Sequence, residues 1–259
     1  MDLIKVKDRA FSFMKPAKNE VLKWFRGNYE IDVKSDLSPV TIADRNAEEI
    51  LRKKIAKCFP EHGIIGEEFG NENITAEWVW TIDPVDGTRS FIRGLPLFAS
   101  MIALLHQGDP VLGIIELPAL GETAWAVKGK GAFLNGKPLK VSKQKKLQGA
   151  FIAVADWYCF QQQKQNSLLN KLNKKAGIVR TYPDAFGHLM AIRGAVDVMV
   201  DPLAKIWDYA PCKIFAQEAG GTFANFTGNQ ASIEEGTAIV GNADIVKEVR
   251  KVFSESKEH

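Results

Sequence analysis

The stretch WTIDPVDGT, residues 80–88, places two carboxylates three positions apart on either side of a proline. The apolar run 78–82 that leads into it is typical of a buried strand. We expect this strand to end at Asp83, because Pro84 has no N–H to continue the pairing and turns the chain. Asp83 and Asp86 can then face one point, so the segment predicts a cation site.

The Gly-Thr step that follows is suited to an anion. Gly87 has no side chain to keep a ligand away from the backbone, and successive N–H groups at such a turn form a cradle for phosphate. Thr88 adds a hydroxyl to that cradle. The same residues also fit an Asp-Pro-x-Asp-Gly turn that joins two strands and binds nothing.

Further acids favour the metal site over the plain turn. Glu67 and Glu68 follow an apolar pair upstream, and Asp208 opens an apolar helical stretch downstream. Carboxylate oxygens are the ligands that Mg²⁺ prefers in proteins. Because acids crowded together without a cation would repel one another and raise their pKa values, such a cluster implies a bound metal.

The chain resembles the inositol monophosphatase family of Mg²⁺-dependent, lithium-sensitive phosphatases. The matching strings follow the family's order and are KSDLSPVTIAD (34–44), GEE (66–68), WTIDPVDGT (80–88), GKGAFLNGKPLKVS (129–142), WDYA (207–210) and EAGG (218–221). The resemblance implies a phosphoric monoester hydrolase that uses a metal-activated water and forms no covalent enzyme intermediate. It also implies a homodimer.

The resemblance further implies a role for each matching residue. Two or three Mg²⁺ ions, bridged by Asp83, would be held by Glu67, Asp83, the backbone carbonyl of Val85, Asp86 and Asp208. Thr88 and Glu67 resemble the pair that orients and activates the water, and Asp44 resembles the acid that hydrogen-bonds the threonine. The N–H groups of Gly87 and Thr88 would hold the phosphate. Glu68 either assists a third metal position or is solvated.

The residues beside the phosphate loop favour the family's histidinol-phosphatase branch. Inositol-type members typically carry Asn after Gly-Thr-x, whereas this chain carries Ser90. The segment 182–188 is similar to the branch's Gly-Asp-x-Tyr-Gly pattern, although Pro183, Phe186 and His188 depart from it. We therefore expect histidinol phosphate as the substrate. Inositol-1-phosphate or a related polyol, sugar or nucleotide phosphate is the alternative.

The expected substrate contacts leave that choice open. Asp184 and Asp201 could pair with the ammonium group of histidinol or accept hydrogen bonds from sugar hydroxyls. Arg89 could contact the substrate or a dimer partner. A bisphosphate substrate would need a second anion pocket, for which the candidates are Arg89, Arg93, Arg180 and Lys205. A non-catalytic binding protein on this scaffold would have no reason to keep the whole acid set.

The composition favours a small-molecule partner. The net charge is +3, from 34 basic and 31 acidic residues, so neither nucleic acid nor a membrane is expected to bind. The lysine-rich run 128–146 contains the hairpin signal Asn135-Gly136 and is interpreted as a solvated hairpin. Three widely spaced cysteines fit a reduced, cytoplasmic location, and no long apolar segment or export signal is found.

The periodicity predicts an α+β fold. We expect helices at 2–26, with a break or bend near Pro16, and at 41–58, followed by an antiparallel meander of short strands over 78–134. Strands and helices then alternate, including helices at 160–175, 184–193, 207–219 and 242–256, which indicates a second sheet between helices. The family's layered αβαβα sandwich agrees with two such mixed sheets. We divide the chain into closely packed halves, 1–148 with the metal and phosphate loop and 149–259 with the specificity residues.

Overall fold

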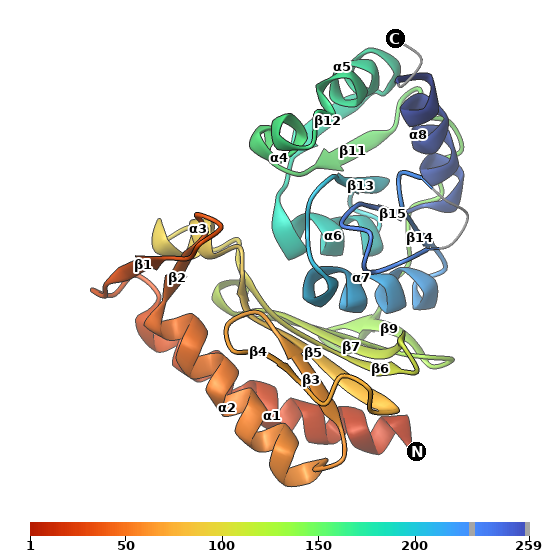
Figure 1. Cartoon of the computed structure of the whole chain (residues 1–259). Helices are drawn as coiled ribbons and strands as arrows, with labels where there is room; N and C mark the ends of the chain where they lie inside the picture. Colours follow the sequence, from red (N-terminus) through yellow and green to blue (C-terminus); the bar gives the residue numbers. More distant parts are fainter. Residues whose placement is uncertain (228–230, 257–259) are drawn as a thin grey trace.

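A computed structural model of the chain describes residues 1–227 and 231–256. The described elements form five layers in the order helix, sheet, helix, sheet, helix (Figure 1). The outer layer beside the larger sheet holds α1 (Leu3–Trp24) and α2 (Ile42–Cys58). The central helices are α6 (Asp184–Ile192) and α7 (Ile206–Glu218). Beyond the smaller sheet lie α4 (Trp157–Gln162), α5 (Asn166–Lys175) and α8 (Ala243–Ser256).

The larger sheet has eight strands in the order β10-β9-β8-β7-β6-β5-β3-β4. They are β3 (Gly63–Gly66), β4 (Gly70–Glu72), β5 (Trp78–Asp86), β6 (Ala99–His106), β7 (Asp109–Leu117), β8 (Glu122–Val127), β9 (Gly131–Leu134) and β10 (Lys137–Pro138). Each neighbouring pair from β5 to β9 is antiparallel, which confirms the predicted meander. Among the described strands of this sheet, only β3 and β5 pair in parallel.

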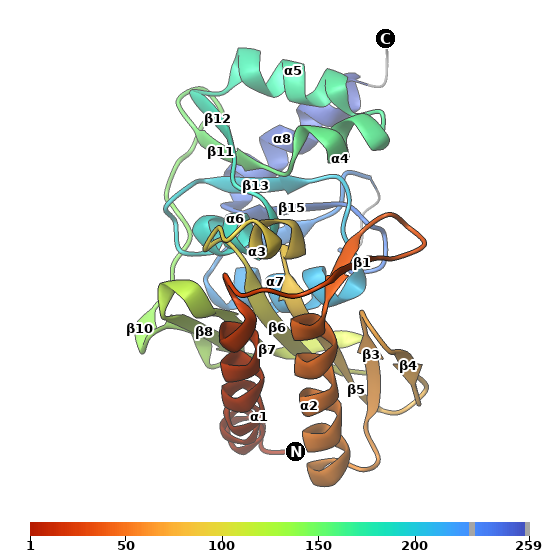
Figure 2. The same ribbon diagram turned by 90° about the vertical axis from the view of Figure 1, so that its left-hand side faces the viewer.

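The smaller sheet has five strands in the order β12-β11-β13-β15-β14 and is mixed. They are β11 (Phe151–Val154), β12 (Ile178–Thr181), β13 (Val198–Asp201), β14 (Thr222–Ala224) and β15 (Ala238–Gly241). The remaining elements are β1 (Ile31–Val33), β2 (Pro39–Thr41), α3 (Thr88–Ile92) and η1 (Pro118–Leu120). Figures 1 and 2 show α3 at the end of the larger sheet that faces α6.

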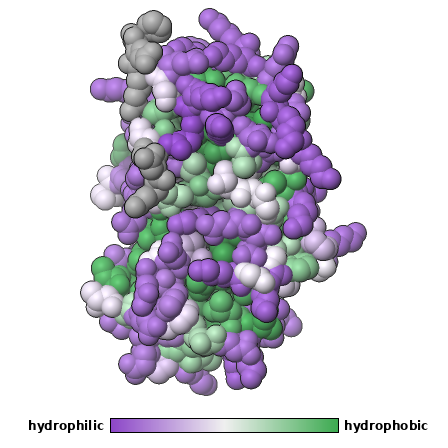
Figure 3. Space-filling model, turned by 90° about the vertical axis from the view of Figure 1, so that its right-hand side faces the viewer, coloured by the Kyte–Doolittle hydropathy of each residue, from purple (hydrophilic) through white to green (hydrophobic). Residues whose placement is uncertain are grey.

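The larger sheet is buried on both faces, because helices cover it from either side. Alternate side chains of one strand enter different apolar clusters: Ile102 and Leu104 pack toward α1 and α2, whereas Met101 and Ala103 pack toward α7 and the smaller sheet. On the face shown in Figure 3, hydrophilic and hydrophobic side chains are interspersed at the surface. Among the described residues, no helix combines the length and apolar character needed to cross a bilayer.

Several predicted boundaries were wrong. β5 does not end at Asp83 but continues through Pro84 to Asp86, with an irregularity in its pairing with β6. Of the break or bend predicted near Pro16, the break is absent, because α1 is one continuous helix with buried residues on both sides of the proline. The predicted helix 160–175 is two helices, α4 and α5, separated by a turn. The helix at 41–58 is confirmed as α2, with Thr41 and Asp44 forming its capping box.

Candidate metal and phosphate site

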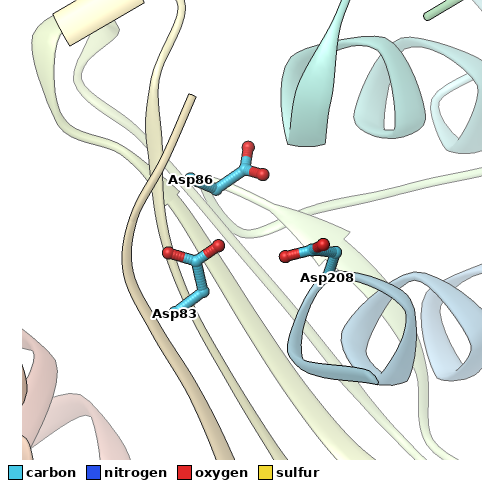
Figure 4. A group of neighbouring side chains, drawn as sticks. All are labelled: Asp83, Asp86 and Asp208. Atoms are coloured by element: carbon cyan, nitrogen blue, oxygen red, sulfur yellow. The ribbon is translucent and has the colours of Figure 1, made fainter. Parts of the chain in front are cut away.

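Three aspartates from two elements converge at the end of the larger sheet. Asp83 and Asp86 come from β5, and Asp208 comes from the first turn of α7 (Figure 4). Each offers a carboxylate oxygen, and these oxygens all lie within 4.8 Å of one another. The structure therefore brings together three of the groups that the sequence predicted as metal ligands, from segments more than a hundred residues apart.

The irregular pairing of β5 explains how two aspartates three positions apart face the same point. In a regular strand, residues three apart point to opposite faces. Here Asp83 pairs with Met101 and Asp86 pairs with Ala99, so three steps along β5 match two along β6. The extra residue restores a common direction for the two carboxylates. Asp208 is fixed separately, because its Oδ2 accepts the backbone N–H of Lys205 at 2.7 Å.

Burial and mutual repulsion make this cluster costly to ionise without a cation. Burial raises the pKa of Asp83, and the charges of Glu67, Asp86 and Asp208 raise it further. Burial likewise raises the pKa of Asp208 to about 7. The Oδ1 atom of Asp83 is buried without a hydrogen-bond partner among the described residues. An oxygen-only donor set with an orphaned carboxylate oxygen fits a hard divalent cation.

Glu67 lies beside the three aspartates rather than among them. Its Oε1 is 2.8 Å from the Nζ of Lys34, which also lies 2.6 Å from Oε1 of Glu68. Burial, followed by the charge of Glu67, raises the pKa of Glu68 to about 7. We did not predict a role for Lys34, although it belongs to the family-like string 34–44.

The predicted threonine and its acid are in contact. The Oγ1 of Thr88 lies 3.1 Å from Oδ1 of Asp44 and 2.9 Å from the carbonyl oxygen of Val85, so its proton can be donated to either. The other oxygen of Asp44 accepts hydrogen bonds from the N–H of Thr41 at 2.8 Å and from its hydroxyl at 2.5 Å. Asp44 is fully buried, and burial raises its pKa. Its orientation toward Thr88 is therefore fixed.

The phosphate loop is crowded by a predicted substrate residue. Gly87 has φ 77°, a left-handed value that favours glycine. A Cβ atom on Gly87 would lie 2.9 Å from Oδ2 of Asp184 and 3.0 Å from the carbonyl oxygen of Leu97. Asp184 also has a positive φ of 59°, and the next N–H, that of Ala185, donates to Oδ2 of Asp86 at 2.7 Å. The first turn of α6 thus joins the metal cluster to the phosphate loop.

The other predicted substrate residues, Asp201 and Arg89, already make contacts within the protein. Asp201 accepts the N–H of Leu203 at 3.1 Å with Oδ1, and its Oδ2 lies 3.2 Å from Nε2 of His188. Arg89 lies over the ring of Tyr158 at 5.9 Å and lines the same cleft as Gly87 and Thr88. We did not predict Asp156, which lines both this cleft and an adjoining pocket with Asp184, because no pattern distinguished it from a surface acid.

Comparisons with known proteins agree on one family. A model of the inositol monophosphatase family matches residues 3–257. The chain is 39% identical over 219 residues to a histidinol-phosphatase of Chlorobaculum parvum, covering 84% of this chain and 85% of that protein. It is 35% identical over 224 residues to a histidinol-phosphatase of Mycobacterium tuberculosis, covering 85% and 86%.

Solved structures show the same layered fold. The IMPase of Thermotoga maritima superimposes with a TM-score of 0.87 and 30% identity, covering 100% of this chain and 99% of that one. The suhB protein of Bartonella henselae superimposes with a TM-score of 0.87 and 27% identity, covering 98% and 99%. Since the family model spans nearly the whole chain, this protein belongs to the inositol monophosphatase family and is a phosphoric monoester hydrolase.

Proposed function

We propose that this enzyme is an Mg²⁺-dependent phosphatase that hydrolyses histidinol phosphate. The observation that carries the metal dependence is the convergence of Asp83, Asp86 and Asp208, whose oxygens lie within 4.8 Å of one another. These three carboxylates would hold the ions, with the carboxylate of Glu67 and the carbonyl of Val85 at the edge of the site. When bound, Mg²⁺ supplies a Lewis acid for the phosphoryl oxygens and makes water more acidic.

The residues around the cluster have separate tasks in this proposal. The Thr88 hydroxyl, by donating its proton to Asp44, leaves its lone pairs to accept a hydrogen bond from the attacking water. Glu67 is the second group that orients this water. The backbone at Gly87 and Thr88 binds the phosphate, because a glycine in the left-handed conformation allows close approach.

The leaving-group side of the site is supplied mainly with acceptors. Within the described part of the chain, the carboxylates of Asp156 and Asp184 have no hydrogen bond or ion pair, and both line the pocket that also contains Asp201 and His188. A protonated amine would satisfy these acceptors and compensate their charge, whereas an uncharged polyol would only hydrogen-bond to them. This chemistry, together with relatives named histidinol-phosphatase, supports an amino-alcohol phosphate over inositol phosphate.

A phosphate-release panel tests the proposal. Histidinol phosphate, inositol-1-phosphate and fructose-1,6-bisphosphate would be compared at fixed Mg²⁺, with and without excess chelator. We expect the highest kcat/KM for histidinol phosphate and no release with chelator. Preference for inositol-1-phosphate would overturn the substrate, and release that survives the chelator would overturn the metal dependence.

We also propose three properties that the family resemblance implies. The enzyme is inhibited by lithium, works as a homodimer and resides in the cytoplasm. The three cysteines, which are free thiols in the structure, support a reducing compartment. Light scattering coupled to size exclusion would measure the mass, for which we expect twice 28.7 kDa.

A further inference from the structure

A buried ion pair lies behind the turn that carries Glu67. Glu48, on α2, is 0% exposed, and its Oε1 accepts the Nε–H of Arg52 at 2.8 Å. Arg52 also donates from Nη1 to Glu72 at 2.9 Å and from Nη2 to the carbonyl of Gly70. The pair therefore connects α2 to β4, the strand that follows the turn after β3.

The carboxylate of Glu48 is directed at the backbone of that turn. Its Oε2 accepts the N–H of Glu68 at 2.8 Å, and its Oε1 accepts the N–H of Phe69 at 3.2 Å. The preceding N–H, that of Glu67, donates to the carbonyl of Ile82 on β5 at 3.2 Å. Three consecutive N–H groups are thus held, the first by the strand that carries the aspartates and the next two by one side chain.

The fit around this carboxylate leaves no room for adjustment. A Cβ atom built on Gly66 would collide with the Glu48 carboxylate and with Nη2 of Arg52. A buried carboxylate is stable only where charge-assisted hydrogen bonds satisfy it, and here all of them come from Arg52 and the turn.

We infer that Glu48 is a positioning residue for the metal site. With Arg52 as its counter-ion, it fixes the backbone at Glu68 and Phe69, so that the Glu67 side chain is directed toward Asp83 and its neighbours. The inference rests on the metal dependence proposed above. Groups that orient metal ligands without touching the ion typically contribute about 10–100-fold in metal affinity.

Glu48→Gln tests this inference, because the amide keeps the shape but cannot accept hydrogen bonds from all three donors. Glu49→Gln is the matched control, since Glu49 is the next residue on α2 and pairs with Lys53 at the same i,i+4 spacing, but at the surface. Binding of Mn²⁺, used as the probe ion, would be followed by electron paramagnetic resonance. We expect the dissociation constant to rise about 10-fold or more in Glu48→Gln and to stay unchanged in Glu49→Gln.

A double substitution shows whether Glu48 acts through Glu67. If it does, Glu48→Gln added to Glu67→Gln weakens Mn²⁺ binding little beyond Glu67→Gln alone, whereas independent effects would add. Additive losses, or wild-type affinity in Glu48→Gln despite a lower melting temperature, would overturn the inference. If Glu48→Gln does not fold, Arg52→Gln decides by the same two criteria. Absence of Mn²⁺ binding by the wild type would instead refute the proposed function.

Discussion

Substitution of Asp83 is expected to affect the stability of the fold and the turnover of the enzyme in opposite directions. The side chain is buried beside three other acids, and one of its oxygens has no partner among the described residues. Asp83→Asn removes a repulsive charge while keeping the shape. Without metal we therefore expect the free energy of unfolding to stay equal or rise. Turnover should fall roughly 100-fold or more, because the electrostatic stabilisation supplied at this position is lost.

The measurements are kcat at saturating Mg²⁺ and the melting temperature with chelator. Asp8→Asn is a suitable control, because it removes an exposed carboxylate from α1. Near-normal Mg²⁺-dependent turnover in Asp83→Asn would contradict the role proposed for this residue.

Thr88 can be tested by comparing a hydroxyl with a methyl group. Thr88→Val keeps the β-branched shape but removes the proton that Asp44 or Val85 accepts. We expect kcat to fall about 100-fold, in the range found for loss of a group that assists proton transfer. Thr88→Ser keeps the hydroxyl and should lose much less. If the valine variant retained more than a tenth of wild-type kcat, Thr88 would have no part in orienting the water.

At the scale of elements, the junction between β5 and α3 gives a stability prediction. Gly87→Ala must place a side chain at φ 77° and between Leu97 and Asp184. Gly108→Ala is the matched control, because Gly108 has φ 85° in the turn between β6 and β7 but nothing within 4 Å of a Cβ. Both should lose about 1 kcal/mol from backbone strain, and Gly87→Ala should lose more through its collisions. Urea denaturation would measure the difference, and equal losses would contradict it.

The long elements of this fold could be predicted from the sequence because their patterns are strong. The capping box at Thr41 and Asp44 and the meander that begins at residue 78 follow from local chemistry. The continuation of β5 through Pro84 could not be predicted, because it depends on an irregular pairing with β6 that only the sheet reveals. The short strands β1, β4 and β14 were also missed, since three residues carry too little periodicity.

The site could be predicted only as far as its residues belong to family-like strings. Asp83, Asp86 and Asp208 do, and the structure brings them together. Asp156 and Glu48 lie outside those strings and take their positions from tertiary contacts, so no local pattern identified them. Lys34 lies within the string 34–44, but its contact with Glu67 and Glu68 depends on the fold. The roles of Asp184, Asp201 and Arg89, and the division of the chain at residue 148, remain predictions.

At the scale of the whole molecule, the three aspartates connect the segments before and after residue 148. β5 supplies two of them and α7 supplies the third, and α7 packs directly on the larger sheet. Without a cation, like charges face each other across this contact. The stability of the entire fold should therefore depend on pH and on Mg²⁺ together.

The raised pKa values of the three aspartates determine whether the metal-free protein gains or loses stability as pH rises. Asp83, Asp86 and Asp208 have pKa values above those of the unfolded chain, and that of Asp208 is raised to about 7. Between the unfolded and folded pKa values the native state binds more protons. Without metal, the stability that these groups contribute is therefore fully present at low pH, and the contribution of Asp208 is lost as pH rises through about 7. With chelator, we expect a lower melting temperature at pH 8 than at pH 6.

Mg²⁺ should reverse this trend, because the ion binds the deprotonated carboxylates and competes with protons for them. The rise in melting temperature on adding Mg²⁺ should therefore be larger at pH 8 than at pH 6, and it should disappear in Asp83→Asn. Differential scanning fluorimetry at pH 6 and pH 8, with chelator and with Mg²⁺, measures how the melting temperature changes with pH in each case. If the melting temperature with chelator were the same at both pH values, the buried aspartates would not be protonated in the native state, and the like charges would have to be compensated by some other means.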